Sequence, residues 1–291
     1  MTVRTVITSS VPGATPKKAI LTVLRGPEVG RVLTLPVGQV ITFGRADDCT
    51  YRFEESGMSR VHARVMSIGG QFIVSDAGST NGTFVNDQRI SSPEPLRGGE
   101  RVQFGTSLTL NFLLVDEAEE EALRRVHETS QRDGLTGVFN RRYLDERLEA
   151  EVAFALRHRT VLSVGILDVD FFKKVNDTRG HLAGDAVLRH LGALLRQSIR
   201  TEDVVGRYGG EEFVLVLRGI DRHGAWQLAD RLRQTVAGQD IPCEGGSLRV
   251  TLSAGVADLT ETGEPATRDS LLKLADTRLY DAKQGGRNRV V

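Results

Sequence analysis

The chain has 291 residues, of which 38 are basic and 38 acidic, so its formal net charge is zero. This balance argues against a protein that grips nucleic acid through its overall field. A content of 40% hydrophobic and 26% charged residues excludes wholesale disorder. No apolar run reaches the roughly 18 residues that a membrane-spanning helix needs, and we expect no signal peptide. Cys49 and Cys243 lie far apart, which favours free thiols in a reducing cytoplasm.

The length suggests about two domains. Residues 1–18 are rich in Thr, Ser and Pro and predict a flexible tail. Residues 19–115 alternate short β-like runs with Gly, Pro and Asn turns, a pattern typical of an all-β sandwich. The predicted strands cover 19–25, 31–35, 40–45, 61–68, 71–75, 82–85, 101–104 and 108–115.

Residues 116–132 predict a linker helix between the two domains. The segment has no Gly or Pro and opens on acidic residues, which suit the positive end of a helix dipole. Ala118, Ala122, Val126 and Thr129 form a thin apolar seam along it. Two interpretations stay open: a short coiled coil between two copies of the chain, or a solvated helix without a partner.

Residues 133–291 alternate helices with strands and predict an α/β domain, with a central mixed sheet and flanking helices. The run 160–169 is nearly all apolar, so we expect a strand buried on both faces. Gly209 and Gly210 separate the β-like runs 204–208 and 213–217, which predicts a hairpin. The predicted helices cover 140–157, 186–200, 225–236 and 270–283, and the last strand covers 248–256.

Three loop segments of the predicted sandwich suit a phosphate. They read Gly-Arg at 44–45, Ser-Arg-Val-His at 59–62 and Gly-Ser-Thr-Asn-Gly at 78–82. Guanidinium groups, hydroxyls and backbone N–H groups are usual phosphate donors, and loops at one end of a sandwich commonly bind ligands. Together the segments resemble the forkhead-associated (FHA) domain, a reader of phosphothreonine peptides. The resemblance implies phosphopeptide binding by Arg45, Ser59, Arg60, Thr80 and Asn81.

The tail adds a hypothesis about that peptide. Thr5, Thr8 and Thr15 precede the sandwich. Once phosphorylated, one of them would meet its own pocket or that of a neighbouring copy at high effective concentration. The phosphopeptide is therefore expected to come either from the chain's own tail or from another protein.

The sequence Tyr-Gly-Gly-Glu-Glu-Phe at 208–213 is the strongest signal in the chain. Two glycines at a hairpin tip let a bulky ligand approach the backbone, and two carboxylates follow at once. The preceding buried strand ends in Asp168 and Asp170. Carboxylates that converge from a strand end and a hairpin are typical of an Mg²⁺ site that substrate phosphates complete. Asn176 and Asp185 have the groups to read the polar edge of a base.

This pattern resembles the GGDEF domain of diguanylate cyclases, in its GGEEF variant, from residue 133 to about residue 290. Further motifs match in order: Asp-Gly-Leu-Thr-Gly at 133–137, Asp-Val-Asp-Phe-Phe-Lys-Lys-Val-Asn-Asp at 168–177 and Gly-His at 180–181. The resemblance implies a nucleotidyl-cyclase-like fold and condensation of two GTP into cyclic di-GMP and two pyrophosphates. Two such domains would meet face to face, each holding one GTP, so the enzyme would act as a homodimer.

The resemblance also implies a role for individual residues. Mg²⁺, with Mn²⁺ as an alternative, would be bound by Asp168, Val169 and Glu211. Catalysis would involve Glu211, Glu212 and Lys173. GTP would be bound by Phe172, Asn176, His181, Asp185, Gly209, Gly210, Lys283 and Arg287.

Arg200-Thr201-Glu202-Asp203 comes shortly before the two glycines. It resembles the R-x-x-D inhibitory product site of the same family, which implies that Arg200 and Asp203 bind cyclic di-GMP and produce feedback inhibition. The alternative is an ordinary salt bridge at a helix end.

Two functions follow from these motifs. The first is an active diguanylate cyclase, regulated by phosphopeptide recognition through the helix at 116–131. The second is a catalytically silent receptor or scaffold that binds GTP or cyclic di-GMP. Because both motif glycines and the carboxylates of 168, 211 and 212 are present, we favour the enzyme.

Overall fold

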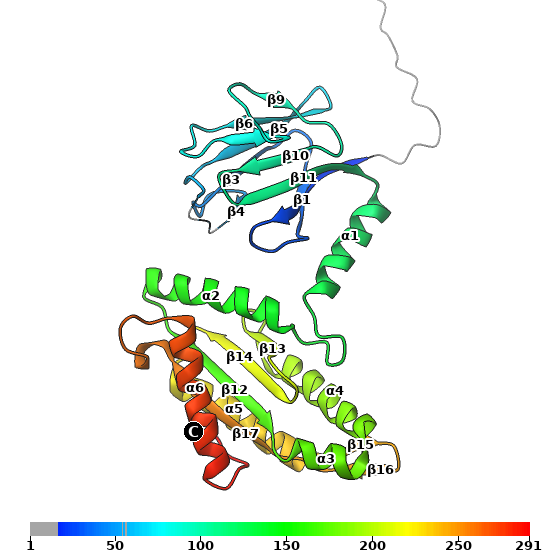
Figure 1. Ribbon diagram of the computed structural model, residues 1–291, viewed down its shortest axis with the longest axis vertical. Coiled ribbons are helices and arrows are strands. Elements are labelled where there is room, and N and C mark those ends of the chain that lie inside the picture. The colour runs from blue at the N-terminus through cyan, green and yellow to red at the C-terminus, as the bar shows by residue number, and fades with distance from the viewer. Residues whose placement is uncertain (1–16, 54, 56) are drawn as a thin grey trace, which may run out of the picture. The chain divides into compact units, whose positions relative to one another are not determined.

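The computed structural model describes residues 17–53, 55 and 57–291, whose course is drawn in Figure 1. Of the predicted tail, only Lys17 and Lys18 belong to the described residues, so Thr5, Thr8 and Thr15 lie outside them. The chain divides into two compact units, one ending at Glu128 and the other beginning at Thr129.

The first unit is a sandwich of two β-sheets, as predicted. One sheet has the strand order β2-β1-β11-β10-β7-β8, and the other has the order β4-β3-β5-β6-β9. Three strands of two residues each were missed, because so short a run cannot show an alternation of apolar and polar residues. The strands are β1 Lys18–Arg25, β2 Val32–Leu35, β3 Val40–Gly44, β4 Tyr51–Arg52, β5 Ala63–Ile68, β6 Gln71–Asp76, β7 Thr83–Val85, β8 Gln88–Arg89, β9 Glu94–Pro95, β10 Arg101–Phe104 and β11 Leu108–Val115.

The core of the sandwich follows from the two-residue period of its strands. In β11, Leu108, Leu110 and Phe112 are buried between the sheets, while the residues between them are partly exposed. Phe43 of β3 meets Phe104 of β10 with ring centroids 5.0 Å apart. This core leaves the connecting loops free to carry the predicted binding residues.

Helix α1, Glu117–Ser130, packs on its own sandwich. Leu123 contacts a small apolar cluster of Ile20, Val32 and Val115 on the outer face of the first sheet. Ala118, Ala122, Val126 and Thr129, the predicted seam, are exposed instead. Helix α1 is therefore anchored to its own sandwich through Leu123, and the predicted seam is not the face that makes this contact.

A buried carboxylate holds α1 in place beside Leu123. Glu120 is only 8% exposed and accepts a hydrogen bond from Thr34 Oγ1 at 2.9 Å. Its carboxylate also lies 2.9 Å from the guanidinium of Arg124 and 3.3 Å from Lys18 Nζ. Burial alone would raise the pKa of Glu120, but the hydrogen bonds from Arg124, Thr34 and Lys18 lower it. The docking face thus combines one apolar contact with one ionised, fully partnered carboxylate.

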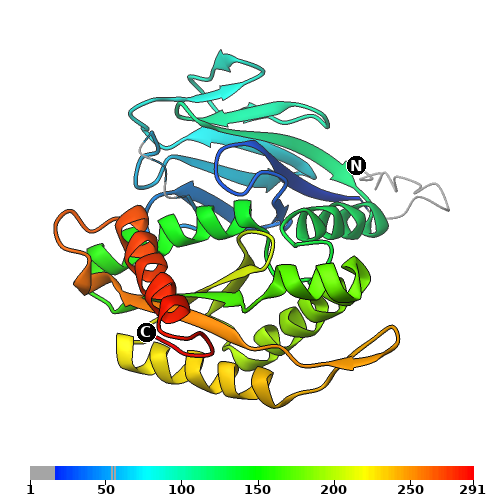
Figure 2. The same ribbon diagram turned by 60° about the horizontal axis from the view of Figure 1, so that its bottom comes forward.

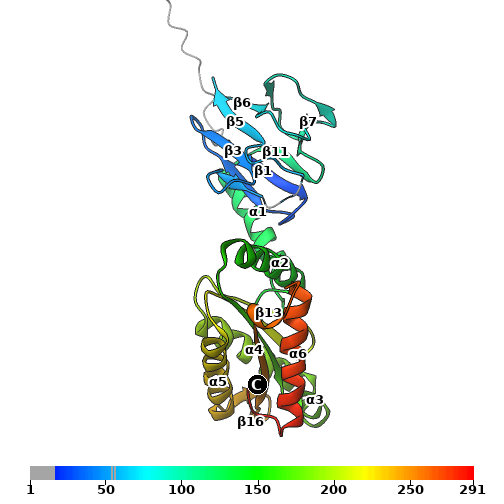
Figure 3. The same cartoon turned by 90° about the vertical axis from the view of Figure 1, so that its left-hand side faces the viewer.

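The second unit is an α/β domain around a four-stranded sheet of order β13-β14-β12-β17. These strands pair antiparallel, and the parallel pairing of the sheet is confined to single bridges at its edges. Helices cover both faces, α2 and α6 on one and α4 and α5 on the other. Figure 2 shows β17 (orange) between α6 (red) and α5 (yellow), and Figure 3 shows α6 and α5 on opposite sides of the sheet.

The elements of this unit extend the predicted ones. They are α2 Arg141–His158, β12 Leu162–Val169, α3 Phe172–Arg179, α4 His181–Ser198, β13 Val204–Arg207, β14 Glu212–Arg218, α5 Arg222–Gly238, β15 Ile241–Cys243, β16 Gly246–Leu248, β17 Leu252–Asp258, a 3-10 turn at Leu259–Glu261 and α6 Arg268–Gln284.

Strand β12 occupies the centre of the sheet, and all eight of its residues are buried, as the apolar run predicted. The hairpin of β13 and β14 is also confirmed. The predicted strand 248–256 is divided, because β16 pairs with β15 whereas β17 pairs with β12. Helix α3 was not predicted; it lies directly after β12. Across the described part of the chain, none of the helices has the length and apolar character to span a bilayer.

Candidate functional site

The predicted phosphate-binding residues lie on loops of the sandwich that hydrogen bonds tie together. The backbone N–H of Thr80 donates to Ser59 Oγ at 3.0 Å, and Asn81 Nδ2 donates to the Gly57 carbonyl at 2.8 Å. Arg45 Nε donates to the Met58 carbonyl at 2.5 Å. The loops that contain 44–45, 57–60 and 80–81 therefore form one connected surface, on which the side chains of Arg45, Arg60, Thr80 and Asn81 are exposed.

Two residues brace this surface from below. His62 is fully buried; its Nδ1 accepts from the Ser59 backbone N–H at 3.2 Å, and its Nε2 lies 3.0 Å from the Gly82 carbonyl. Gly44 permits the close approach of strand β3, because a Cβ there would lie 2.1 Å from the Arg60 carbonyl. The hydrogen bonds of His62 and the close packing at Gly44 both fix the backbone of these loops, as a binding surface requires.

Asp76 is a bracing residue that the sequence reasoning missed. Its carboxylate accepts hydrogen bonds from the backbone N–H groups of Gly78 and Ser79, both at 2.9 Å, and from the hydroxyls of Ser79 and Thr83. Burial alone would raise the pKa of Asp76, but these hydrogen bonds lower it. An Asp two residues before the Gly-Ser-Thr-Asn-Gly segment is the signal that could have found it, because Asp commonly caps such a turn.

In the second unit, the strand end and the hairpin bring three carboxylates together. Asp168 of β12 stands directly opposite Glu212 of β14 in the sheet register, and the Val169 N–H donates to the Glu211 carbonyl at 3.4 Å. Burial, followed by the charge of Asp168, raises the pKa of both Glu211 and Glu212. Burial also raises the pKa of Asp168, although Lys283 Nζ lies 2.8 Å from its Oδ2 and opposes that rise.

This arrangement fits a divalent cation that a bound phosphate group would complete. Among the described residues, no three His, Cys, Asp or Glu side chains form a group able to hold a metal ion. Asp168 and Glu211 supply two carboxylates whose negative charges disfavour one another in a partly buried place. Mg²⁺ characteristically takes one or two protein carboxylates and fills its other positions with water and substrate oxygens. The donor set therefore suits Mg²⁺ together with a nucleotide and not a cage of protein ligands.

A cavity of about 610 Å³ lies beside these carboxylates. It brings together the predicted Phe172, Lys173, Asn176, His181, Asp185, Gly210 and Glu211. Three further residues, Asp177, Leu188 and Arg207, line it without having been predicted as ligands. Asp168, Val169, Gly209, Glu212, Lys283 and Arg287 are not among its lining residues, and the ion pair of Lys283 with Asp168 places that pair at the strand end.

Two glycines lie at or beside the residues that line this cavity. A Cβ at Gly184 would lie 2.0 Å from Asn176 Oδ1, so only glycine lets α4 approach the side chain that is predicted to read the base. A Cβ at Gly210 would meet no atom within 4 Å. The hairpin tip therefore presents bare backbone to open space, as the sequence predicted for a nucleotide site.

Arg207 is the clearest residue that sequence reasoning missed. Its guanidinium donates to the Gly210 carbonyl from Nε at 3.0 Å and from a terminal nitrogen at 2.6 Å, and its other terminal nitrogen lies 3.2 Å from Asp133 Oδ1. Burial would raise the pKa of Asp133, but hydrogen bonds from Thr136 and the charge of Arg207 lower it. Arg207 thus ties the hairpin tip to the first turn of the domain.

The predicted product site is brought together only in part. Arg200 lines a cavity of about 260 Å³ with two further arginines, Arg132 and Arg196. Asp203 is buried and does not line that cavity; its Oδ2 accepts from the Arg200 backbone N–H at 3.2 Å, and burial raises the pKa of Asp203. Asp203 therefore shapes the turn, while the arginines supply the exposed charge.

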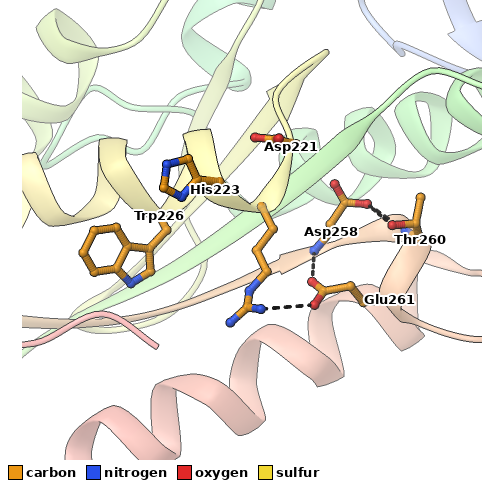
Figure 4. Close-up of a pocket in the computed structure, with 7 residues that line it drawn as sticks. Asp221, His223, Trp226, Asp258, Thr260 and Glu261 are labelled. Carbon is orange, nitrogen blue, oxygen red and sulfur yellow. Dashed lines mark hydrogen bonds and ion pairs between the residues drawn. The ribbon is translucent and has the colours of Figure 1, made fainter.

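A further cavity of about 570 Å³ is lined by Asp221, His223, Trp226, Asp258, Thr260 and Glu261, which Figure 4 shows as sticks. Because Asp258 pairs with Ser163, this cavity lies at the end of β12 opposite to Asp168. Its carboxylates are already satisfied within the fold. Asp258 accepts from the backbone and hydroxyl of Thr260, and Glu261 is paired with Arg278 at 2.8 Å. We therefore place the candidate nucleotide site at the hairpin and not here.

Comparison with known families supports both halves of this description. The profile described as "Diguanylate cyclase, GGDEF domain" matches residues 130–289, and that of the FHA domain matches residues 41–105. The response regulator PleD of Caulobacter vibrioides is 42% identical over 166 residues, which cover 56% of this chain and 36% of PleD. Diguanylate cyclase DosC of Escherichia coli is 36% identical over 214 residues, 73% of this chain and 45% of DosC. The chain spans less than half the length of these curated relatives.

Solved structures give the same result for the fold. The coiled coil and GGDEF domain of DgcB from Caulobacter crescentus, in complex with c-di-GMP, matches with a TM-score of 0.56 and 29% identity, over 60% of this chain and 92% of that one. Diguanylate cyclase SiaD of Pseudomonas aeruginosa, in complex with its activator SiaC, matches with a TM-score of 0.55 and 37% identity, over 60% and 66% of the two chains. The chain belongs to the diguanylate cyclase GGDEF-domain family, and an FHA domain precedes its GGDEF domain.

Proposed function

We propose that the chain is a diguanylate cyclase that condenses two molecules of GTP into cyclic di-GMP and two pyrophosphates. In each step the 3′-hydroxyl oxygen of one GTP forms a bond to the α-phosphorus of the other. The bond from that phosphorus to the bridging oxygen of the β-phosphate breaks, and pyrophosphate leaves with the electron pair. The hydroxyl proton passes to a carboxylate or to water. The observation that carries the proposal is one cavity shared by Asn176, Asp185 and Glu211.

A divalent cation, Mg²⁺ with Mn²⁺ as an alternative, would neutralise phosphate charge and make the α-phosphorus more electrophilic. Asp168, the Val169 carbonyl and Glu211 are the groups that would hold it. Their support is the sheet register that aligns β12 with the hairpin, together with the pKa values of Asp168 and Glu211. Burial raises both pKa values, and the charge of Asp168 adds to the rise at Glu211.

The other residues are assigned by their chemistry and place. Asn176 and Asp185 would read the guanine edge, with Phe172 and His181 beside them in the cavity. Gly209 and Gly210 would admit the nucleotide to the hairpin backbone. Glu212, whose pKa burial raises, is suited to receive or orient the hydroxyl proton. Lys173, Lys283 and Arg287 would contact phosphates, and Lys173 would offset the charge that grows in the transition state.

In its described residues, one chain offers one cavity that would read a base and one pair of carboxylates that would hold the cation, so the proposed reaction needs two copies. The test is purified chain with GTP and Mg²⁺, with cyclic di-GMP and pyrophosphate measured in the same samples. We expect two pyrophosphates for each cyclic di-GMP. Tight GTP binding without product at high protein concentration would favour the silent receptor instead. The unpaired cysteines, Cys49 and Cys243, suit the reducing cytoplasm that we propose as its compartment.

We further propose that the FHA domain binds a phosphothreonine peptide and thereby regulates the cyclase. Arg45 and Ser59 would hold the phosphate, Arg60 and Thr80 would line its pocket, and Asn81 would hold the peptide main chain. Support comes from the exposure of the cationic and polar side chains on loops that are tied together by Ser59 and Asn81. Calorimetry with a phosphothreonine peptide library, on the native chain and on Arg45→Ala, tests this. Arg97→Ala, which removes an exposed arginine, is the control and is expected to bind normally.

The third proposal is product feedback at Arg200 and Asp203. Three arginines around one cavity supply the charge for a dianionic dinucleotide, and Asp203 holds the turn. In Arg200→Ala we expect the concentration of cyclic di-GMP that half-inhibits the enzyme to rise at least about tenfold, as the loss of a charge-assisted contact predicts. Unchanged inhibition in that variant would remove this assignment and leave the cyclase activity untouched.

A further inference from the structure

The C-terminal turn after α6 adopts a backbone conformation that needs external support. Arg287 and Asn288 have φ values of 59° and 46°, two successive non-glycine residues in the left-handed region. This conformation is strained for residues that carry a Cβ. The turn persists because hydrogen bonds hold it, and it carries Arg287, a proposed phosphate contact. The segment beyond it returns alongside β17, where Ala254 N–H donates to the Arg289 carbonyl at 2.9 Å (Figure 2).

Asp170 supplies the first support. It is 4% exposed, and its Oδ2 accepts from the Asn288 backbone N–H at 3.0 Å and from Thr251 Oγ1 at 2.6 Å. Its Oδ1 accepts from Ser253 Oγ at 2.7 Å. The sequence placed Asp170 with the carboxylates that converge on a cation. In the structure its oxygens are used to join the turn at Asn288 to strand β17, so we assign it no cation-binding role.

Phe171 supplies the second support. It is itself left-handed, with φ 57°, and its ring is 60% exposed. Phe171 is the N-cap of α3, and an exposed phenylalanine in the left-handed region is uncommon. The guanidinium of Arg287 lies over the ring, 4.5 Å from its centroid, a distance at which a cation is attracted to an aromatic face. The ring is therefore a platform that fixes where the Arg287 charge is held.

Asp170 and Phe171 are the two residues that come directly after β12, the strand that ends in Asp168 and Val169. We propose that Asp170 and Phe171 are positioning residues, which hold the Arg287 turn so that its guanidinium is presented to nucleotide phosphate in register with the Asp168 carboxylate. The inference rests on the proposed function, because it takes Arg287 as a phosphate contact. One short segment thereby sets the position of both the carboxylate and the cation.

A double-mutant cycle tests the platform. The variants are Phe171→Leu, Arg287→Met and the two combined, with Phe171→Tyr as the matched control that keeps an aromatic face. The readouts are the dissociation constant for a non-hydrolysable GTP analogue with Mg²⁺, measured by calorimetry, and KM and kcat for cyclic di-GMP synthesis. In Phe171→Leu we expect the dissociation constant and KM to rise about two- to fivefold, the size of an exposed cation–π contact, with kcat nearly unchanged. We expect Phe171→Tyr to keep the dissociation constant and the KM of the native chain.

The combined variant decides whether Phe171 acts through Arg287. We expect Phe171→Leu to add nothing once Arg287 is Met. An equal effect in both backgrounds, or none in either, overturns the inference. Asp170→Asn is a second variant, since Asn cannot accept from all three donors; it is expected to raise KM in the same direction. If Asp170→Asn lowers kcat alone, as loss of folded protein would, the positioning role of Asp170 is wrong. If the native chain binds the analogue but makes no cyclic di-GMP, the proposed activity is wrong. The dissociation constants of the double-mutant cycle still test whether Phe171 positions Arg287.

Discussion

Glu211 is the side chain on which the proposed chemistry depends most directly. It lines the nucleotide cavity, and burial and the nearby Asp168 raise its pKa. Sequence reasoning identified it from the spacing of two glycines and two glutamates. The same reasoning missed Arg207, because no local pattern contains its hydrogen bonds to the Gly210 carbonyl or its ion pair with the sequence-distant Asp133. Asp170 was assigned to the cation-binding carboxylates because it lies close to Asp168 in the sequence, which suggested that both side chains bind the same cation.

We predict that Glu211→Gln lowers cyclic di-GMP synthesis by about 100-fold or more, the scale of losing a charge that stabilises the transition state. The thermal midpoint should stay equal or rise slightly, since one repelling carboxylate is removed. Synthesis and melting are measured on the same preparation. Glu146→Gln, which changes an exposed glutamate on α2, is the control. A variant as active as the native chain would rule out Glu211 as a required group.

Glu261 gives a pH-dependent prediction at the same scale. Its hydrogen bonds to Arg278 lower its pKa from 4.5 to about 2, against the opposing effect of burial. A carboxylate with a depressed folded pKa adds stability that is complete above its unfolded pKa and is lost as pH falls toward its folded pKa. Glu261→Gln should therefore lower the free energy of unfolding by about 1–2 kcal/mol at pH 7, allowing for partial exposure.

The difference in the free energy of unfolding between Glu261→Gln and the native chain should shrink as the pH is lowered from 4.5 toward 2. Urea unfolding at pH 7 and pH 3 measures it. The exposed Glu244, changed to Gln, is the control and should show little difference at either pH. If Glu261→Gln lowers the free energy of unfolding equally at pH 7 and pH 3, the side chain of Glu261 stabilises the fold by packing and not by its charge.

At the scale of elements, α1 shows how a pattern can identify a helix and still misplace its face. The predicted seam follows the small apolar residues, yet the docking face is built from Leu123 and the charged Glu120. A glutamate reads as solvent-facing in any sequence pattern. Here it is buried because Lys18, Thr34 and Arg124, which are distant along the chain or one turn away, satisfy it. Docking to its own sandwich makes α1 part of the FHA-bearing unit.

We predict that Leu123→Ser speeds hydrogen exchange of the backbone amides in 117–130, because the apolar contact with Ile20, Val32 and Val115 is lost, a change of about 1 kcal/mol. Val126→Ser is the matched control: Val126 is 69% exposed, so exchange should not change. Hydrogen exchange with mass spectrometry reports both variants. Equal protection of α1 in the two variants would show that the helix does not depend on this contact.

At the scale of the whole molecule, the proposed reaction is divided between two copies. In its described residues, each copy offers one candidate nucleotide cavity, beside Asp168, Glu211 and Glu212, and each GTP would need such a set of carboxylates to be activated. Regulation by a phosphopeptide would then act by changing how often two GGDEF domains meet, through the helix at 116–131. This remains a proposal about the assembled protein, supported by the order of the domains and by the helix between them.

We predict that an excess of Glu211→Gln suppresses the native chain. Mixed dimers would hold one competent half-site and could not close both bonds of the cyclic product. Cyclic di-GMP synthesis is measured at fixed native chain and increasing variant, and Glu146→Gln is added in parallel as the control. Activity that simply follows the amount of native chain, whatever the variant concentration, would contradict a two-copy site.

The sequence by itself determined the two domain types, the sandwich and α/β architectures, and the motif residues. These depend on local period, turn residues and ordered short motifs, all of which are written along the chain. Only the tertiary structure decided the docking face of α1, the use of Asp170 at the C-terminal turn, and the tie from Arg207 to the hairpin. Each depends on contacts between residues far apart in sequence, such as Asp170 with Asn288. Burial and hydrogen bonding between distant segments, which no local pattern contains, determine what a charged side chain does there.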